Sequence, residues 1–263
     1  MSDYTHGHAD AVLASHRWRT AENSAAYLLP HLTPQTRLLD IGSGPGTITA
    51  DLARRVAHVT AVEQTPDALA LTTAEIERQG LKGVEGVVGD IHGLPFADDT
   101  FDVVHAHQVL QHVADPVAAL REMRRVCRPG GLVAARDADH ATFAWWPADP
   151  VLDRWLELIR VVHQRTTGDP DAGRRLLAWA HEAGFTDVTP TVTAWCFGTP
   201  AERDYWGGMW ERRILESAIT DRILDAGLAD RAELEAISAA WRRWVEDPDG
   251  WFMVPNGEIL ARA

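Results

Sequence analysis

The chain has 263 residues with 38 acidic and 25 Lys or Arg side chains, which gives a formal net charge of −13. This charge, with no basic cluster, argues against a nucleic-acid substrate because phosphates would be repelled. No apolar run reaches the ~20 residues that cross a bilayer, and no signal-peptide core begins the chain, so we expect a cytoplasmic protein without a membrane partner. The two cysteines, Cys127 and Cys196, predict buried free thiols.

The segment 38–56 predicts a buried strand, a tight turn and a helix. Apolar residues run from Leu38 to Ile41, and later ones recur at helical spacing at Ile48, Leu52 and Val56. The turn between them holds three glycines at alternate positions, Gly42, Gly44 and Gly46. Glycine lets the backbone bend sharply and lets a ligand approach the main chain. The turn therefore predicts a nucleotide-type cofactor site.

The spacing of these glycines distinguishes between cofactors. A dinucleotide-binding turn has the pattern G-x-G-x-x-G, whereas this chain has D-x-G-x-G-x-G with Asp40 before the first glycine. A carboxylate there repels a pyrophosphate and suits a ligand with an ammonium group. The arrangement resembles motif I of the class I S-adenosylmethionine-dependent methyltransferases.

Four further segments resemble this family, in the order that the family has them. They are Ala61–Glu63, Gly89–Ile91, Phe101–Val113 and Arg128–Val133. Residues 36–137 match nearly continuously. Within the family, the chain is most similar to the ubiquinone/menaquinone-type group, which includes many enzymes that tailor natural products.

The resemblance implies S-adenosylmethionine as the cofactor. It implies that Glu63 binds the ribose hydroxyls and that Asp90 accepts from the adenine amino group. A bidentate Arg19 suits the cofactor's carboxylate. The full set of expected cofactor-binding residues is Arg19, Asp40, Gly42, Ser43, Gly44, Gly46, Glu63, Gln64, Asp90, Ile91 and Gln108.

Strands and helices alternate through the first half of the chain, which predicts a parallel sheet with helices on both faces. The resemblance implies an α/β, Rossmann-like fold with a seven-stranded, mostly parallel sheet that ends in an antiparallel strand. We expect one domain over 1–263. Its parts are an N-terminal helical lid (1–35), the cofactor-binding core (36–137), helical lid insertions (138–172 and 199–248) and the last strands (173–198 and 249–263).

Local signals predict where several of these elements begin. Asp115-Pro116 and Asp149-Pro150 each place a carboxylate cap before a proline that starts a helix. Thr199 with Glu202, and Asp230 with Glu233, have the form of capping boxes. Further expected elements are helices from Ser15 through Leu29 and over 172–183, and strands over 188–197 and within 251–263.

Ten of the eleven tryptophans follow residue 144, in the predicted lid and last strands. Rigid aromatic surfaces in a lid suit a flat acceptor that is apolar or cationic. The expected substrate-binding residues are Tyr4, Trp145, Trp146 and Trp206. Trp155, Trp179 and Trp241 lie at helical spacing and are predicted to fill the core instead.

Methyl transfer from a sulfonium requires alignment of the two partners, and a base only if the nucleophile arrives protonated. His107, near the carboxyl end of the predicted fourth strand, is the expected base. His105 lies one layer deeper, and His112 is expected to be structural. Asp137, Asp139 and His140 with His107 offer an alternative metal site, but the acid-rich set of catechol-type enzymes is not repeated, so we expect no metal.

The sequence favours a methyltransferase acting on a small, aromatic or polycyclic metabolite, as a monomer or a homodimer. A C-methyltransferase of isoprenoid quinones is the runner-up within this class. A fold relative that binds the cofactor without methyl transfer, such as a cyclase, stays open, because the motifs serve cofactor binding. The glycine spacing disfavours a nicotinamide-dependent oxidoreductase.

Overall fold

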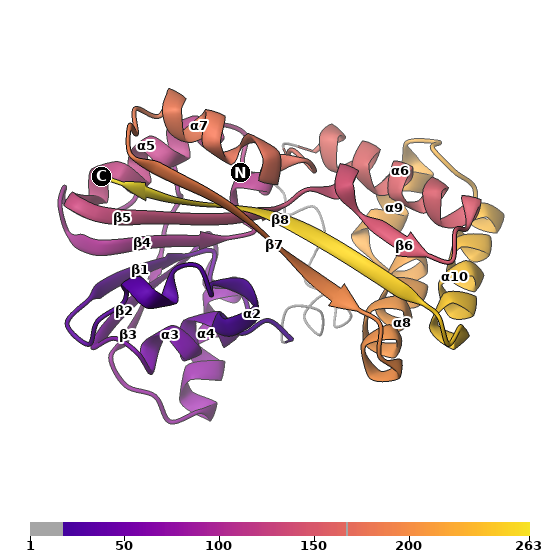
Figure 1. Cartoon of the computed structure of the whole chain (residues 1–263), viewed down its shortest axis with the longest axis horizontal. Helices are drawn as coiled ribbons and strands as arrows, with labels where there is room; N and C mark the ends of the chain where they lie inside the picture. The colour runs from indigo at the N-terminus through magenta and orange to yellow at the C-terminus, as the bar shows by residue number, and fades with distance from the viewer. Residues whose placement is uncertain (1–17, 167) are drawn as a thin grey trace.

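The computed structural model describes residues 18–166 and 168–263. Its centre is an eight-stranded sheet with the order β3-β2-β1-β4-β5-β8-β6, and β7 pairs with β8 (Figure 1). The strands are β1 (Arg37–Ile41), β2 (His58–Glu63), β3 (Val84–Val88), β4 (Phe101–His107), β5 (Cys127–Ala138), β6 (Ala144–Trp146), β7 (Val188–Phe197) and β8 (Trp251–Arg262). β1 to β5 are parallel, and β8 runs antiparallel to β5, β6 and β7. The predicted Rossmann-like fold is confirmed, with the short β6 as an unpredicted addition.

Helices connect and cover these strands. The α-helices are α2 (Ala21–Ser24), α3 (Thr47–Ala53), α4 (Pro66–Arg78), α5 (Pro116–Val126), α6 (Pro150–Arg165), α7 (Leu176–Glu182), α8 (Pro200–Glu216), α9 (Ala218–Asp225) and α10 (Arg231–Glu246). The 3-10 turns are η1 (Leu29–His31), η2 (Leu110–His112), η3 (His140–Thr142) and η4 (Ala172–Arg175).

Alternating side chains of the central strands fill two separate apolar cores. Leu39 and Ile41 of β1 belong to a cluster with α5 and α7, whereas Leu38 belongs to a cluster with α2 and α3. Because successive strand residues point to opposite faces, a continuous apolar run serves both layers. This double burial fixes the end of β1, where the glycine turn begins.

The capping signals set the helix starts as the sequence predicts. Asp115 and Asp149 accept from backbone N–H groups of the first turns of α5 and α6, and Thr199 and Glu202 form a reciprocal capping box on α8. Asp230 caps α10 by accepting from the Glu233 amide, but the expected capping box is not complete, because the Glu233 carboxylate accepts from Arg154 instead.

Three local predictions are wrong. Instead of a long N-terminal helix, the described part has a four-residue α2 that begins after Thr20 and a 3-10 turn at Leu29–His31. The segment 172–183 opens as a 3-10 turn before α7 begins at Leu176. Cys196 is exposed because it lies on the outward face of β7, whereas Cys127 is buried as expected and its burial raises the pKa of its thiol to about 12.

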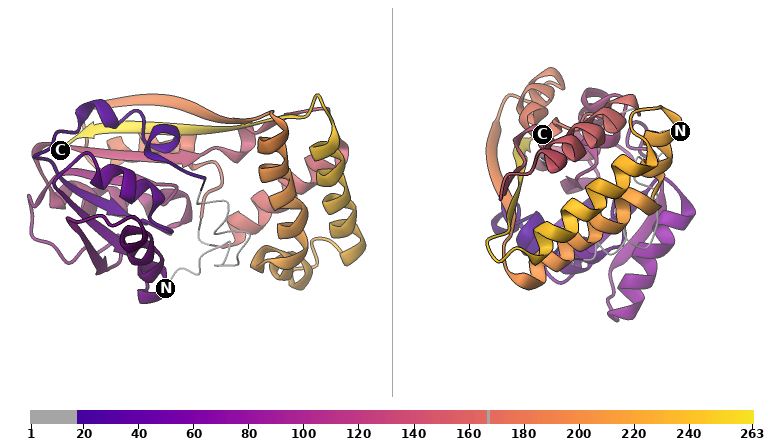
Figure 2. Two further views of the ribbon diagram at one scale, coloured as in Figure 1. Left: turned by 90° about the horizontal axis from the view of Figure 1, so that it is seen from below. Right: turned by 90° about the vertical axis from the view of Figure 1, so that its right-hand side faces the viewer.

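The segments expected to form the lid contain α6, α8, α9 and α10, which gather beyond the end of the parallel strands (Figures 1 and 2). Trp155 lies at its centre, with ring centroids 4.7 Å from Trp210 and 4.8 Å from Trp241. β7 and β8 extend from the core into this region, and Phe252 of β8 packs within the same apolar cluster. Two long strands therefore connect the lid to the core.

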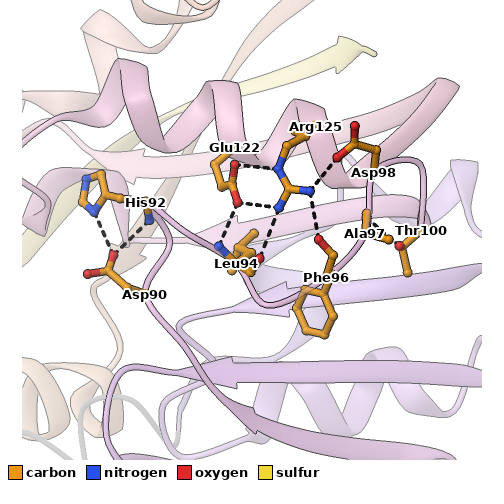
Figure 3. A network of polar contacts seen from close by, with 9 residues as sticks. All are labelled: Asp90, His92, Leu94, Phe96, Ala97, Asp98, Thr100, Glu122 and Arg125. Carbon is orange, nitrogen blue, oxygen red and sulfur yellow. Dashed lines mark hydrogen bonds and ion pairs between the residues drawn. The ribbon is translucent and has the colours of Figure 1, made fainter.

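The loop after β3 is held against α5 by a polar network (Figure 3). Arg125 donates to the carbonyls of Leu94 (3.1 Å) and Phe96 (2.8 Å) and to the carboxylates of Asp98 and Glu122. Glu122 in turn accepts from the Leu94 amide at 2.8 Å. The loop that follows the expected adenine segment is thus fixed through its backbone.

We predict that Arg125→Ala loosens this loop. The variant should lower the free energy of unfolding by about 1–3 kcal/mol, because several charge-assisted bonds to the backbone are lost. It should also speed hydrogen exchange at the Leu94 amide. Arg78→Ala, which removes an exposed pair with Glu75 on α4, is the control and should leave that exchange unchanged. Equal Leu94 protection in the wild type and Arg125→Ala would contradict the prediction.

Candidate functional site

A cavity of about 650 Å³ lies between the carboxyl ends of the parallel strands and the lid. Its volume is within the range of small-molecule sites. The core side contributes the glycine turn, the ends of β2 and β4, and the loop after β3. The opposite wall comes from η3, β7 and α8. The cavity therefore joins the predicted cofactor motifs to the aromatic lid.

The glycine turn has the backbone that its sequence predicts. Gly42, Gly44 and Gly46 have φ values of +69°, +56° and +81°, in the left-handed region that favours glycine. A Cβ on Gly46 would lie 2.9 Å from the Cα of Thr72 on α4. The hydroxyl of Thr72 donates to the Gly44 carbonyl and lies 2.8 Å from the Ser43 hydroxyl. Thr72, which the motif analysis missed, thus supports the turn from α4.

Glu63 connects the turn to the end of β2. Its carboxylate accepts from the Gly44 amide at 2.5 Å. Both residues line the cavity, and a Cβ on Gly44 would meet only the Gly42 carbonyl oxygen, at 4.0 Å. The main chain is therefore open to a ligand beside a carboxylate. This arrangement fits the adenosine part of the implied cofactor.

Asp40 lines the cavity but is 3% exposed. Its carboxylate accepts from the Thr49 hydroxyl at 2.6 Å and from Nδ1 of His105 at 2.8 Å. His105 is fully buried beneath it and does not line the cavity, as its strand position predicts. The Asp40 carboxyl group is therefore held in one position under the turn by its contacts with α3 and β4.

The remaining expected cofactor residues also meet at this cavity. Asp90 accepts from the His92 amide (2.9 Å), and chiefly this bond lowers the pKa of its carboxyl group. Gln108 has a φ of +53° and donates from Nε2 to Asn256 of β8 at 3.1 Å. Of the predicted cofactor-binding residues, only Gly46 does not line the cavity, because it packs against α4. The others do: Arg19, Asp40, Gly42, Ser43, Gly44, Glu63, Gln64, Asp90, Ile91 and Gln108.

Histidines line the middle of the cavity. His107, the expected base, is 7% exposed at the end of β4, and its ring centroid lies 5.7 Å from that of Trp195. His112 and His140 also line the cavity, and His163 packs behind both, at 4.9 and 5.5 Å between ring centroids. Burial lowers the pKa of all three, that of His163 to about 4, so these imidazoles are neutral at pH 7.

The alternative metal set is dispersed. Asp137 is fully buried and accepts from the Gln111 amide, and its burial raises its pKa to about 8. Asp139 is paired with Arg174 at 2.7 Å. Over residues 18–166 and 168–263, the structure contains no group of three or more His, Cys, Asp and Glu side chains that could hold a metal ion.

The four residues expected to bind substrate have different positions. Trp206 lines the cavity and stacks on Phe197 at 4.5 Å. Trp145 stacks on Phe252 within the lid, and Trp146 is 59% exposed. Neither tryptophan lines the cavity, since pairing of β6 with the first residues of β8 places them outside it, and their role in substrate binding stays a prediction. Tyr4 lies outside the described residues.

The sequence motifs did not predict most of the residues that line the cavity on the side opposite the glycine turn. One stripe of α8 faces the cavity, formed by Trp206, Met209, Trp210 and Arg213. Its spacing of three and four residues marks one helix face and was the available signal. Trp195 and Tyr205 also line the cavity. No spacing rule indicated these two, because their positions depend on how β7 and α8 pack.

A methyltransferase domain model matches residues 39–135. An uncharacterized methyltransferase of Schizosaccharomyces pombe is 32% identical over 98% of this chain and 96% of its own length. The chain belongs to the S-adenosylmethionine-dependent methyltransferases. A probable methyltransferase of Aspergillus luteorubrus, ltbC, is 28% identical over 99% of this chain and 97% of its own length.

The fold of the methyltransferase agrees with this assignment. The YcgJ protein of Bacillus subtilis has a TM-score of 0.58 at 17% identity, covering 92% of this chain and 98% of its own. The cofactor is S-adenosylmethionine, and the open glycine turn beside Glu63 fits it. In the described part of the methyltransferase, no helix is long and apolar enough to cross a membrane.

We predict that Gly46→Ala damages the cofactor site more than Gly80→Ala. Gly80 also has a positive φ (+63°), but a Cβ there meets no atom within 4 Å, so its variant carries backbone strain alone. Gly80→Ala should cost about 1–2 kcal/mol of stability. Gly46→Ala adds a collision with the α4 backbone and should cost more.

Thermal unfolding and calorimetric titration with S-adenosylmethionine measure both effects. Gly80→Ala should bind the cofactor as the wild type does, whereas Gly46→Ala should bind at least ~10-fold more weakly, since displaced turn amides lose their ligand contacts. Equal affinity in the two variants would show that the turn does not shape the site.

Proposed function

We propose that this enzyme transfers a methyl group to a small, aromatic or polycyclic metabolite. The observation that supports the proposal is one continuous cavity, which joins the glycine turn to an aromatic wall made of Trp18, Phe143, Trp195, Tyr205, Trp206 and Trp210. Aromatic rings offer large, rigid surfaces to a flat acceptor. A cavity shared by both sites brings the donor and the acceptor into reach of each other.

The cofactor-side residues have separate roles in this proposal. Glu63 binds the ribose hydroxyls and keeps the turn in place through the Gly44 amide. Asp90 and Ile91 hold the adenine ring, on the loop that Arg125 fixes. Asp40 supplies negative charge for the ammonium end of the cofactor. Arg19, whose guanidinium lies 5.2 Å from the Trp195 ring centroid, pairs with the cofactor's carboxylate.

When bound, S-adenosylmethionine supplies an electrophilic methyl group on a positively charged sulfur. The protein aligns the acceptor with it, since the lid wall and the turn face the same space. The buried aromatic side chains exclude water. His107 accepts the acceptor's proton on an imidazole nitrogen if the nucleophile arrives protonated.

A C-methyltransferase of isoprenoid quinones is the second candidate. The demethylmenaquinone methyltransferase of Renibacterium salmoninarum is 27% identical over 66% of this chain. A quinol ring suits the aromatic wall as well. Both candidates share the cofactor site and differ in the acceptor.

We predict tight binding of S-adenosylmethionine and transfer of its labelled methyl group. Calorimetry should give stronger binding of the cofactor than of NAD, and Glu63→Gln should weaken it at least ~10-fold, because charge-assisted bonds to the ribose are lost. Glu85→Gln on β3, an exposed site, is the control.

Mass spectrometry of metabolite extracts incubated with methyl-labelled cofactor identifies the acceptor. A demethylated quinol in a parallel reaction tests the second candidate. Tighter binding of NAD would refute the cofactor assignment. Cofactor binding without any labelled product, across broad extracts, would favour a relative that does not transfer the methyl group.

We predict that His107→Gln lowers kcat by about 100-fold or more on the acceptor found in this way, because a general base is lost. The Kd for S-adenosylmethionine should stay unchanged. His140→Gln is the comparison, since this neutral imidazole lines the same cavity. If kcat fell in His140→Gln and not in His107→Gln, the general base would be His140 of η3 and not His107 of β4.

A further inference from the structure

Gln108 lies at the cavity wall with a backbone that few residues of its kind adopt. It follows β4 directly and lines the cavity, and its φ of +53° is in the left-handed region that is unfavourable for a residue with a long side chain. The backbone N–H of Gln108 donates to the Arg136 carbonyl of β5 at 2.7 Å, which holds this conformation. Strained backbone of this kind collects at functional sites, so the side chain that it directs is of interest.

The side-chain amide of Gln108 has one orientation, because a chain of hydrogen bonds assigns its two polar atoms. The Val254 carbonyl can only accept, so the Asn256 atom that lies 2.9 Å from it is the nitrogen Nδ2. The other polar atom of Asn256 is then the oxygen Oδ1, which accepts from Gln108 at 3.1 Å. The Gln108 atom in this contact is therefore the nitrogen Nε2, and the oxygen Oε1 is directed elsewhere.

Oε1 of Gln108 is available to a ligand. Within residues 18–166 and 168–263 this oxygen has no hydrogen-bond partner, and it is not enclosed by other atoms. Gln108 is partly buried and lines the cavity, so the oxygen is open on the cavity side. An amide oxygen accepts and cannot donate. The group that it binds is therefore an O–H or an N–H.

Asn256 sets this orientation from outside the cavity. Its side chain is fully buried on β8 and does not line the cavity. A buried amide is costly unless hydrogen bonds satisfy it, and both polar atoms of Asn256 are bonded. These bonds fix the amide of Asn256 and, through it, the amide of Gln108.

The contact with Asn256 draws the Gln108 amide away from the carboxylates on the cofactor side. β5 and β8 lie on one side of β4 in the sheet, and β1 and β2, whose ends carry those carboxylates, lie on the other. Val254 shares a strand face with Asn256, and both Val254 and its β7 partner Trp195 line the cavity. The Gln108 amide therefore approaches the aromatic wall, where the acceptor is proposed to bind.

We propose that the methyl acceptor carries an O–H or N–H group that donates to Oε1 of Gln108, and that Asn256 is the positioning residue for this contact. The inference rests on the proposed methyl transfer and adds the class of acceptor, a flat ring with a hydrogen-bond donor as substituent. It assigns to the acceptor a side chain that was expected to bind the cofactor. Aromatic surfaces leave a flat ring free to turn in its own plane, whereas one directed hydrogen bond fixes that rotation. In-line transfer requires such a fixed ring.

Three probes with one ring system test the donor group on protein saturated with S-adenosylhomocysteine. They are 6-hydroxyquinoline, 6-methoxyquinoline and quinoline, of which only the first donates a hydrogen bond. Calorimetry should show that 6-hydroxyquinoline binds about 3- to 10-fold more tightly than either of the others, as expected for one neutral hydrogen bond.

Gln108→Met keeps the length of the side chain and should abolish the preference for the hydroxyl, with the affinity for S-adenosylhomocysteine unchanged. Asn256→Leu should also abolish it, because the Gln108 amide loses the partner that sets its orientation. Asn256→Asp should retain it, since a carboxyl oxygen still accepts from Nε2, and this difference separates positioning from a general loss of structure. Gln164→Met, at an exposed site on α6, is the matched control and should keep the wild-type preference.

A preference that survives in Gln108→Met, or equal binding of 6-hydroxyquinoline and 6-methoxyquinoline to the wild type, overturns the inference and leaves the aromatic acceptor standing. A Gln108→Met variant that keeps the preference and binds S-adenosylhomocysteine ~10-fold more weakly would assign Oε1 to the ammonium group of the cofactor, which also overturns it. If none of the three probes binds to the wild type, the proposed aromatic acceptor is refuted, and the inference with it.

Discussion

The pairing of β8 with strands on both of its sides holds the two halves of the site together. Its C-terminal half lies between β5 and β7, and its first residues pair with β6 and β7. Because backbone ladders on both sides resist sliding, the lid cannot shift along the core without breaking many hydrogen bonds. The distance between the two sides of the cavity therefore depends on β8, a strand that lies outside the cofactor motifs.

Buried polar groups strengthen this junction. Arg136 of β5 donates to Glu258 of β8 at 3.0 Å, and Thr191 of β7 donates to the same carboxylate. A buried ion pair is stable only when its hydrogen bonds are all formed, so this pair favours one register of β5 against β8 over others. The Arg136 guanidinium also lies 4.8 Å from the Trp195 ring, which it holds against the cavity near His107. Polar contacts between β5, β7 and β8 thereby orient Trp195, which lines the cavity.

The sequence predicted the parts of the fold that local chemistry determines. The glycine turn, the carboxylate caps at Asp115 and Asp149 and the bounds of β7 depend on neighbouring residues, and the structure confirms them. Positions set by tertiary packing were not accessible. Trp146 and Trp206 look alike as sequence, yet β6 leaves the first exposed while α8 directs the second to the cavity. Arg213, which lines the cavity, was not predicted there because an arginine is ordinarily a surface residue.

The carboxylates on the proposed donor side have a consequence for turnover. In the proposed site, Asp40 and Glu63 attract a sulfonium more strongly than the neutral thioether that remains after transfer, so this side of the cavity favours the reactive donor over its product. The two carboxylates come from the ends of neighbouring parallel strands, β1 and β2, and both line the cavity. The preference for the charged donor therefore depends on the register of the sheet as well as on the glycine turn.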